Sequence, residues 1–303
     1  MYETKTTASD WDKTLITLSK GPSESESQKC ENTENAIRKA ITSNAKLSQM
    51  DISIFAQGSY KARTNVRAES DVDIAVLLNT VAYNDYPVGL TAENFGFTPA
   101  KIEFIDFKNL VKQAMEEYFG YFNIDRSGKK SIKVHSNTYR VDADVVPMFC
   151  HNHFLSANPD DCLRGVAFST NEGMIIKNWP QQNYENGIQK NTATKRKYKR
   201  LIRILKRLKA YMIQEGIQEA NIPSYLIECL VWNVPNVEFF HDSLYQNLRQ
   251  ILFYLWDKTR TNETCSNWGE VNELKYLFST SQPWTFQQAH NFILATWKYI
   301  GYK

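Results

Sequence analysis

The residues FAQGSYKARTNVRAESDVDIAVLL (Phe55–Leu78) are the most informative part of the sequence. A Gly-Ser pair follows an apolar run, and twelve residues after Ser59 a second apolar run contains Asp71 and Asp73. Side chains alternate along a β-strand, so both carboxylates share one face and the intervening apolar residues share the other. Two carboxylates so close repel each other, and partial burial would raise the cost further. A hard divalent cation with oxygen ligands is therefore expected on this face.

A second strand with the same pattern lies in RVDADVVP, where Asp142 and Asp144 share a face. A single Asp-x-Asp strand is most often solvated surface at a sheet edge. Two such strands in one chain, the first preceded by a Gly-Ser turn, favour a metal site instead.

The Gly-Ser turn is a candidate anion site. Gly58 lets the backbone approach a phosphate closely, and Ser59 can donate its hydroxyl and its amide at the start of a short helix. Most Gly-Ser pairs are ordinary turns, so the argument depends on the acidic strand that follows. The sequence has no G-x-x-x-x-G-K-[ST], which excludes a P-loop as the phosphate cradle.

Composition limits the class of protein. The chain has 303 residues, 42% of them hydrophobic, and a formal net charge of +3 from 36 basic and 33 acidic residues. These values predict a globular protein of two domains and argue against a nucleic-acid coat or a membrane surface. Five cysteines without a CxxC pair, and no signal pattern at the N-terminus, indicate reduced thiols and a cytoplasmic location.

The element pattern predicts an α+β fold. Strands are expected at 52–56, at 72–78 and in a hairpin over 131–147 that ends at Pro147, and Asp106 is expected to cap a helix to Tyr118. Helices are expected at 194–213, after Pro223, at 243–256 and twice more before Tyr299. We expect N-terminal helices over 1–50, including a long helix that braces both lobes, an α/β core over 51–190 and a helical lobe over 191–303.

The segment TKRKYKRLIRILKRLKAYM reads as an amphipathic helix with Lys199, Arg203 and Lys206 on one face. A solvated basic face accounts for most of these charges. However, no Asp or Glu lies between Asn186 and Gln214, so the basic row has no acidic partner nearby in sequence. A triphosphate could lie between this row and the acidic strands.

Two further segments carry possible ligands. CHNHF places Cys150, His151 and His153 near Cys162, but the spacing fits no common zinc finger, so a surface loop is expected. NWPQQNYENGIQKN is polar and is expected to form a loop, in which Asn178, Tyr184 and Asn186 could read a base edge.

The Gly-Ser pair, the Asp-x-Asp strand and a third Asp before V-V-P resemble the polymerase-β-like nucleotidyltransferases. The resemblance is closer to the branch that holds 2′-5′-oligoadenylate synthase, cyclic GMP-AMP synthase and the bacterial CD-NTases of anti-phage CBASS systems. It implies a polymerase-β-like nucleotidyltransferase lobe followed by a helical lobe. It also implies site residues: Asp71, Asp73 and Asp144 as catalytic metal ligands, and Gln57, Gly58, Ser59, Lys206, Ser224 and Tyr225 as nucleotide-binding residues. Pro223 supports this placement of Ser224, because a proline can open a helix and leave amides free beside it, and Tyr225 could stack on a base.

The resemblance further implies an activity. Two Mg²⁺ ions, with Mn²⁺ able to substitute, would assist the joining of nucleoside triphosphates such as ATP and GTP into a cyclic di- or oligonucleotide with release of pyrophosphate. The expected protein is a monomer whose partners are its substrates and an effector that binds the product, with no membrane and no obligatory nucleic acid. Two alternatives stay open: a nucleotidyltransferase that acts on RNA, a small molecule or a protein, and a non-catalytic nucleic-acid sensor or scaffold. The bases, the 2′-5′ or 3′-5′ linkage, the ring size and the activating signal do not follow from the sequence.

Overall fold

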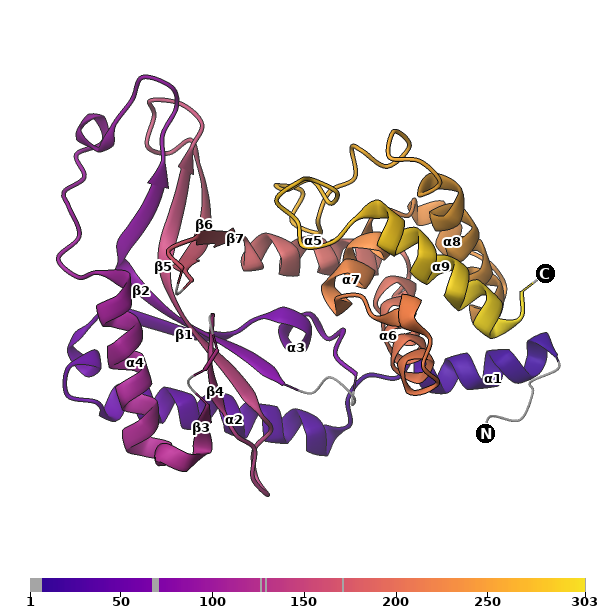
Figure 1. Ribbon diagram of the computed structural model, residues 1–303, viewed down its shortest axis with the longest axis horizontal. Coiled ribbons are helices and arrows are strands. Elements are labelled where there is room, and N and C mark those ends of the chain that lie inside the picture. Colours follow the sequence, from indigo (N-terminus) through magenta and orange to yellow (C-terminus); the bar gives the residue numbers. More distant parts are fainter. Residues whose placement is uncertain (1–6, 67–70, 126, 129, 171, 303) are drawn as a thin grey trace. The chain divides into compact units, whose positions relative to one another are not determined.

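The computed structural model describes residues 7–66, 71–125, 127–128, 130–170 and 172–302. Its contacts divide the chain into two compact units (Figure 1). The helical unit contains the described parts of residues 1–22, 62–69 and 182–303, and the sheet unit contains those of 23–61 and 70–181.

Both units are built from elements that follow one another in chain order. The helices are α1 (Ala8–Leu18), α2 (Glu24–Ser43), α3 (Gly58–Ala62), α4 (Phe104–Phe119), α5 (Pro180–Ala193), α6 (Lys197–Gln214), α7 (Ser224–Trp232), α8 (Leu244–Lys258) and α9 (Phe286–Ile300). The strands are β1 (Ile52–Ala56), β2 (Val72–Asp85), β3 (Ile124–Asp125), β4 (Ile132–Val134), β5 (Ala143–Phe154), β6 (Cys162–Ser169) and β7 (Ile175–Asn178). The predicted α+β fold class is confirmed.

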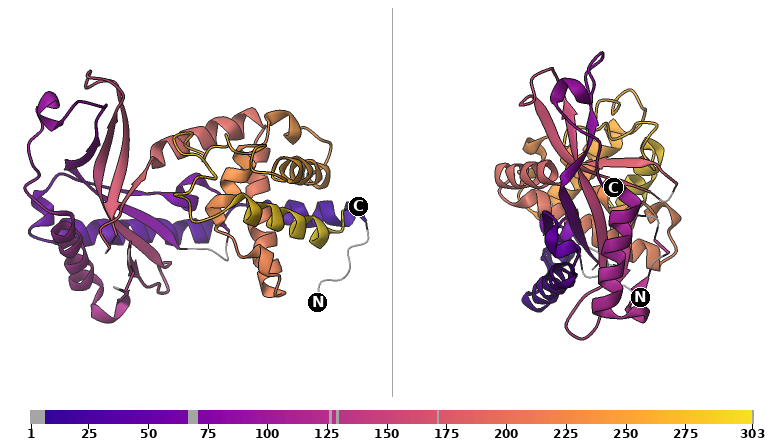
Figure 2. Two further views of the ribbon diagram at one scale, coloured as in Figure 1. Left: turned by 45° about the horizontal axis from the view of Figure 1, so that its top comes forward. Right: turned by 90° about the vertical axis from the view of Figure 1, so that its left-hand side faces the viewer.

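The sheet unit is a mixed sheet covered by helices. Strand order is β1-β2-β5-β4-β3, and β6 joins β5 to β7. β2 and β5 run parallel, and the other pairs are antiparallel. α2 and α4 pack against each other and against these strands (Figure 2). The cluster they bury contains Ile37, Ile41, Ile74, Val76, Phe107, Val111 and Val145.

Two strand predictions need correction. β2 extends beyond Leu78 to Asp85, with a break in register between Leu78 and Ala82 that the polar Asn79 in the sequence disguises. Pro147 does not end β5, which continues to Phe154. β4 pairs with β5 up to Val145 and β6 pairs with it from Phe149, so Pro147 lies where neither strand needs an amide donor.

The long N-terminal helix is α2, whose first turn is closed by a capping box between Ser23 and Glu26. It ends at Ser43 rather than near Lys46, and its predicted role as a brace for both lobes stays a prediction. α4 begins at Phe104 with Glu103 at the N-cap, so Asp106 lies in the first turn and does not cap the helix as predicted.

The helical unit has its own apolar core, formed mainly by α6, α7, α8 and α9. Leu15 and Leu18 of α1 belong to this core, so the chain before Ser23 groups with the C-terminal helices rather than with α2. The units are therefore not the consecutive segments 1–50, 51–190 and 191–303, because domain membership follows packing and not position along the chain.

Two helix predictions are also wrong. The polar segment after Trp179 forms helix α5, with Pro180 as its first residue, a position that proline tolerates well. Only α9 is found where two aromatic-rich helices were expected, because residues 262–284 form turns in the described chain. Within the described residues, no helix is both long and apolar enough to cross a bilayer.

Candidate active site

Asp73 and Asp144 lie side by side in the sheet unit. Asp73 of β2 and Asp144 of β5 are direct partners in the parallel register, so their side chains leave the sheet on the same face. Both side chains are partly exposed, whereas their neighbours Val72, Ile74 and Val145 are buried. The two Asp-x-Asp strands therefore meet at one acidic edge, as the alternation predicted.

The Gly-Ser turn lies directly against this acidic edge. Gly58 begins α3 with a left-handed backbone, φ 64°. A Cβ on this residue would lie 3.2 Å from Asp73 Cγ and would overlap Asp73 Oδ2. The amide of Gln57 donates to the Asp73 carbonyl at 2.9 Å. Glycine is thus required twice here, by the backbone angle and by the neighbouring carboxylate.

Asp71 is engaged by a lysine that sequence reasoning missed. Lys133 Nζ on β4 donates to Asp71 Oδ2 at 2.8 Å and lies 3.4 Å from Asp142 Oδ2. The hydrogen bond to Asp71 raises the pKa of Lys133. Burial raises the pKa of Asp142, but hydrogen bonds from Ser136 and the charge of Lys133 outweigh it and lower that pKa overall. Alternation along β4 would have placed Lys133 on this face, had its pairing with β5 been known.

Asp144 receives a second polar contact, from Ser131 Oγ at 3.1 Å. In the described part of the chain, no three His, Cys, Asp or Glu side chains converge as a ligand set in this conformation. The donor chemistry nevertheless fits Mg²⁺, since Asp73 and Asp144 offer oxygens on one face and Asp71 lies two residues before Asp73. Asp71 could join them only after leaving Lys133.

The predicted phosphate lysine is deeply buried in the helical unit. Lys206 on α6 is 1% exposed, and its Nζ lies 2.7 Å from Glu228 Oε1 on α7. The expectation of a basic row without acidic partners is therefore wrong for Lys206, because its partner comes from another helix. Arg203 also does not face solvent freely: it donates to the carbonyls of Ser19 and Arg63. A phosphate contact by Lys206 stays a prediction.

Ser224 and Tyr225 begin α7, as the resemblance implied, with Pro223 at the N-cap. Lys209 Nζ donates to Ser224 Oγ at 2.8 Å. The Tyr225 hydroxyl donates to Asn183 Oδ1 at 3.0 Å and to Glu270 Oε2 at 3.2 Å. Both residues are partly exposed, and their predicted contacts to phosphate and base stay predictions.

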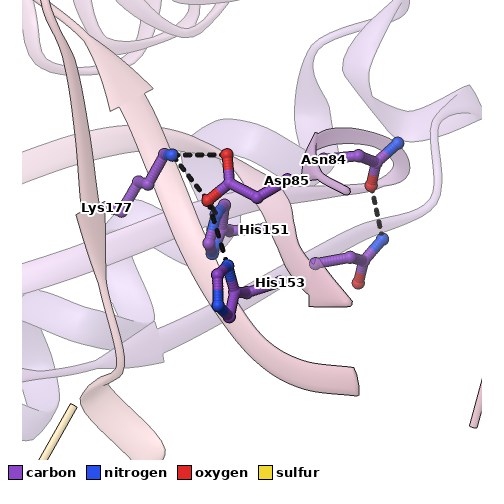
Figure 3. Close-up of polar contacts among 6 residues, drawn as sticks. Asn84, Asp85, His151, His153 and Lys177 are labelled. Carbon is purple, nitrogen blue, oxygen red and sulfur yellow. Dashed lines mark hydrogen bonds and ion pairs between the residues drawn. The ribbon is translucent and has the colours of Figure 1, made fainter. Parts of the chain in front are cut away.

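A separate polar cluster occupies the far end of β2 and β5 (Figure 3). Asp85 accepts from Lys177 Nζ at 2.6 Å, and its Oδ2 lies 3.0 Å from His151 Nε2 and 3.4 Å from His153 Nδ1. The CHNHF segment is therefore strand β5 and not a surface loop. The Cys150 thiol points instead to the carbonyls of Leu78 and Asn79.

Comparison with known proteins places the chain in a family. The model of the cGAS/DncV-like nucleotidyltransferase C-terminal helical domain matches residues 185–301. A cyclic dipyrimidine nucleotide synthase from Legionella pneumophila is 41% identical over 96% of this chain and 98% of its own length. The chain belongs to the cGAS/DncV-like nucleotidyltransferases.

Two solved structures extend this result. The CdnE c-UMP-AMP synthase of Rhodothermus marinus, with Apcpp and Upnpp, is 30% identical, has a TM-score of 0.84 and matches over 96% of this chain and 97% of its own. The CdnE cyclic dinucleotide synthase of Elizabethkingia meningoseptica, with GTP and Apcpp, is 33% identical, with a TM-score of 0.79 and coverage of 96% and 99%. This nucleotidyltransferase thus shares its fold with enzymes that were determined with nucleotides bound.

Proposed function

We propose that this nucleotidyltransferase joins two nucleoside triphosphates into a cyclic dinucleotide, with release of pyrophosphate and with Mg²⁺ held by Asp71, Asp73 and Asp144. The observation that supports this most is the direct pairing of Asp73 with Asp144 beside the Gly58 turn. The names of the relatives support the cyclic product.

The reaction transfers a nucleotidyl group twice. A ribose hydroxyl of one nucleotide attacks the α-phosphorus of the other, a new O–P bond forms, and the bond from that phosphorus to the β-phosphate bridging oxygen breaks. Pyrophosphate leaves, and the same step repeated between the two joined nucleotides closes the ring. Bound Mg²⁺ would supply neutralisation of the triphosphate and of the leaving charge.

The side chains of the acidic edge hold the ligand set in place. Ser131 fixes one oxygen of Asp144, and the lack of a Cβ at Gly58 leaves room for the Asp73 carboxylate. Lys133 holds Asp71 by a hydrogen bond and must release it for the full set to form. The acidic edge is therefore assembled in two steps, with Asp73 and Asp144 placed first.

On the nucleotide, Gln57, Gly58 and Ser59 are proposed to face phosphate. Lys206, Ser224 and Tyr225 are proposed to hold the triphosphate and the base. For Lys206 this requires its ammonium to move away from Glu228, whereas Ser224 already accepts a hydrogen bond from a second cation, Lys209.

The test is product formation by matched Asp variants. The purified protein, α-labelled nucleoside triphosphates and Mg²⁺ should give a product that resists phosphatase, with no other macromolecule added. Asp73→Asn should abolish this product. Asp142→Asn, on the neighbouring strand and bound to Lys133 and Ser136, should retain it. Product from Asp73→Asn, or equal loss in both variants, would contradict the proposal.

The same assay separates the alternatives. Label that appears only after RNA, a protein or a small acceptor is added would favour the other class of nucleotidyltransferase. Tight, strongly salt-dependent duplex binding with no product would favour a sensor. Mass spectrometry and linkage-specific nucleases would identify the bases, the linkage and the ring size. We further propose that the enzyme acts as a cytoplasmic monomer and that its product activates an effector in anti-phage defence.

A further inference from the structure

A buried charged centre lies in the helical unit, away from the surface. Glu228 Oε1 on α7 receives two hydrogen bonds: from Lys206 Nζ on α6 at 2.7 Å and from Thr64 Oγ1 at 2.8 Å. Lys206 and Thr64 are each 1% exposed and Glu228 is 9% exposed. One carboxylate oxygen therefore joins two helices to a segment that precedes β2.

Helix packing alone does not explain this arrangement. A buried ion pair loses much of its attraction to desolvation, and well-packed apolar residues can replace such pairs at little cost in stability. The surrounding residues Leu205, Ile227 and Leu230 already supply an apolar interface between α6 and α7. What an apolar pair could not supply is an acceptor for the Thr64 hydroxyl.

The segment that Thr64 belongs to has a particular place in the chain. It connects α3, which carries Gly58 and Ser59, to the acidic strand that begins after Asp71. Residues 62–69 group with the helical unit, although the chain on both sides groups with the sheet unit. The described part of this segment is held at several points: the Arg63 carbonyl by Arg203, the Thr64 hydroxyl by Glu228, and Val66 by burial.

The backbone of the segment needs such support. Arg63 has φ 55°, a left-handed angle that non-glycine residues adopt at a cost and keep only where their surroundings enforce it. The residue that follows it is Thr64, whose bond to Glu228 is made by the side chain and fixes the direction in which the chain leaves the strained position.

We propose that Glu228 is a positioning residue for nucleotidyl transfer. Its carboxylate, with its charge balanced by Lys206, holds Thr64 and thereby fixes the connection between the Gly58–Ser59 turn and the Asp71–Asp73 strand. This rests on the proposed function, since it assigns both ends of the connection to one reaction. Glu228 contacts neither the carboxylates nor α3, and it acts through Thr64.

Substitutions at Thr64 test the link without changing any proposed ligand. Thr64→Val keeps the shape and removes the hydroxyl, Thr64→Ser keeps the hydroxyl, and Thr64→Cys offers a weaker donor. Each is made in the full chain. We expect kcat for cyclic product to fall about 10- to 100-fold in the Val variant, because a small misplacement of reacting groups has effects of that order. The Ser variant should turn over like the wild type and the Cys variant should lie between them.

Two further measurements separate positioning from general destabilisation. The KM for nucleotide and the melting temperature should change little across the series, while amide hydrogen exchange at residues 63–66 should quicken in the Val variant and not in the Ser variant. Equal turnover of the Val and Ser variants would overturn the proposal, as would a loss of kcat that only follows the melting temperature. A wild type that makes no cyclic product refutes the proposed function and this proposal together, whereas a productive wild type with a fully active Val variant refutes the positioning role alone.

Discussion

The Gly58 turn gives the sharpest test of the acidic edge. Gly58→Ala places a methyl group where the structure has the Asp73 carboxylate, 3.2 Å from Cγ and in overlap with Oδ2. The turn cannot retreat easily, since the neighbouring Gln57 amide is bonded to the Asp73 carbonyl. The carboxylate must therefore rotate or shift, and it is one of the proposed metal ligands.

Two effects of different size follow from this substitution. A left-handed backbone at alanine costs about 1–2 kcal/mol, because its Cβ approaches the following carbonyl. For a chain of this length that lowers the melting temperature by about 2–8 °C. Displacing Asp73 by about 1 Å should reduce turnover by about 100-fold, far more than the loss of folded protein could explain.

Gly89→Ala is the matched control. Gly89 also has a left-handed backbone, φ 85°, but no atom lies within 4 Å of its Cβ position. Both variants should melt lower by a similar amount, and only Gly58→Ala should lose cyclic product in the labelled-nucleotide assay. Equal turnover in the two variants would refute the claim that Gly58 makes room for a catalytic carboxylate.

Three further perturbations have defined outcomes. Lys206→Met leaves Glu228 buried without its ion pair and should lower the free energy of urea unfolding by about 3–5 kcal/mol, while a second change, Glu228→Leu, should restore most of it; a double variant as weak as the single one would contradict this account. Lys133→Met removes the cation at Asp71, so Mg²⁺ should raise the melting temperature of this variant more than that of the wild type; an equal shift would argue against Asp71 as a ligand. Burial lowers the pKa of His151 below its ordinary 6.5, although the hydrogen bond from Asp85 opposes it. The unfolded chain then binds the proton at higher pH than the folded chain, so stability falls as the pH drops below about 6.5. His151→Gln should flatten the melting temperature between about pH 7 and pH 5, and an unchanged slope would assign the loss to other groups.

The acidic edge could be predicted because its signal is local. Alternation along a strand depends only on residues two apart, so the sharing of a face by Asp71 and Asp73, and by Asp142 and Asp144, follows from the sequence. The apolar residues between them fix which face is buried. That β2 and β5 are neighbours does not follow from either segment alone, and the resemblance to a known family supplied it.

The polar partners could not be predicted in the same way. Lys133, Thr64 and Glu228 become neighbours of their partners only through packing between distant segments. Glu228 stands inside the apolar run YLIECLVW, where a single carboxylate gives no periodic signal. The polar helix α5 was missed for a related reason: its residues are stabilised by contacts outside the helix, such as Lys190 Nζ with the Val234 carbonyl.

The position of Lys206 shows how these two kinds of information combine. The sequence pattern LIRILK correctly identified the helix and the lysine, but helical period alone placed its charge on an open basic face. Burial at 1% means that the ammonium needs an acceptor in the folded protein at all times, because an unpaired buried charge is far more costly than a paired one. Glu228 meets that need in this conformation, and a triphosphate that takes over the role must release Glu228 at the same moment. If both proposals hold, nucleotide binding at Lys206 therefore changes the charge balance of the carboxylate that holds Thr64, which links substrate occupancy in the helical unit to the conformation of the connection that precedes Asp71.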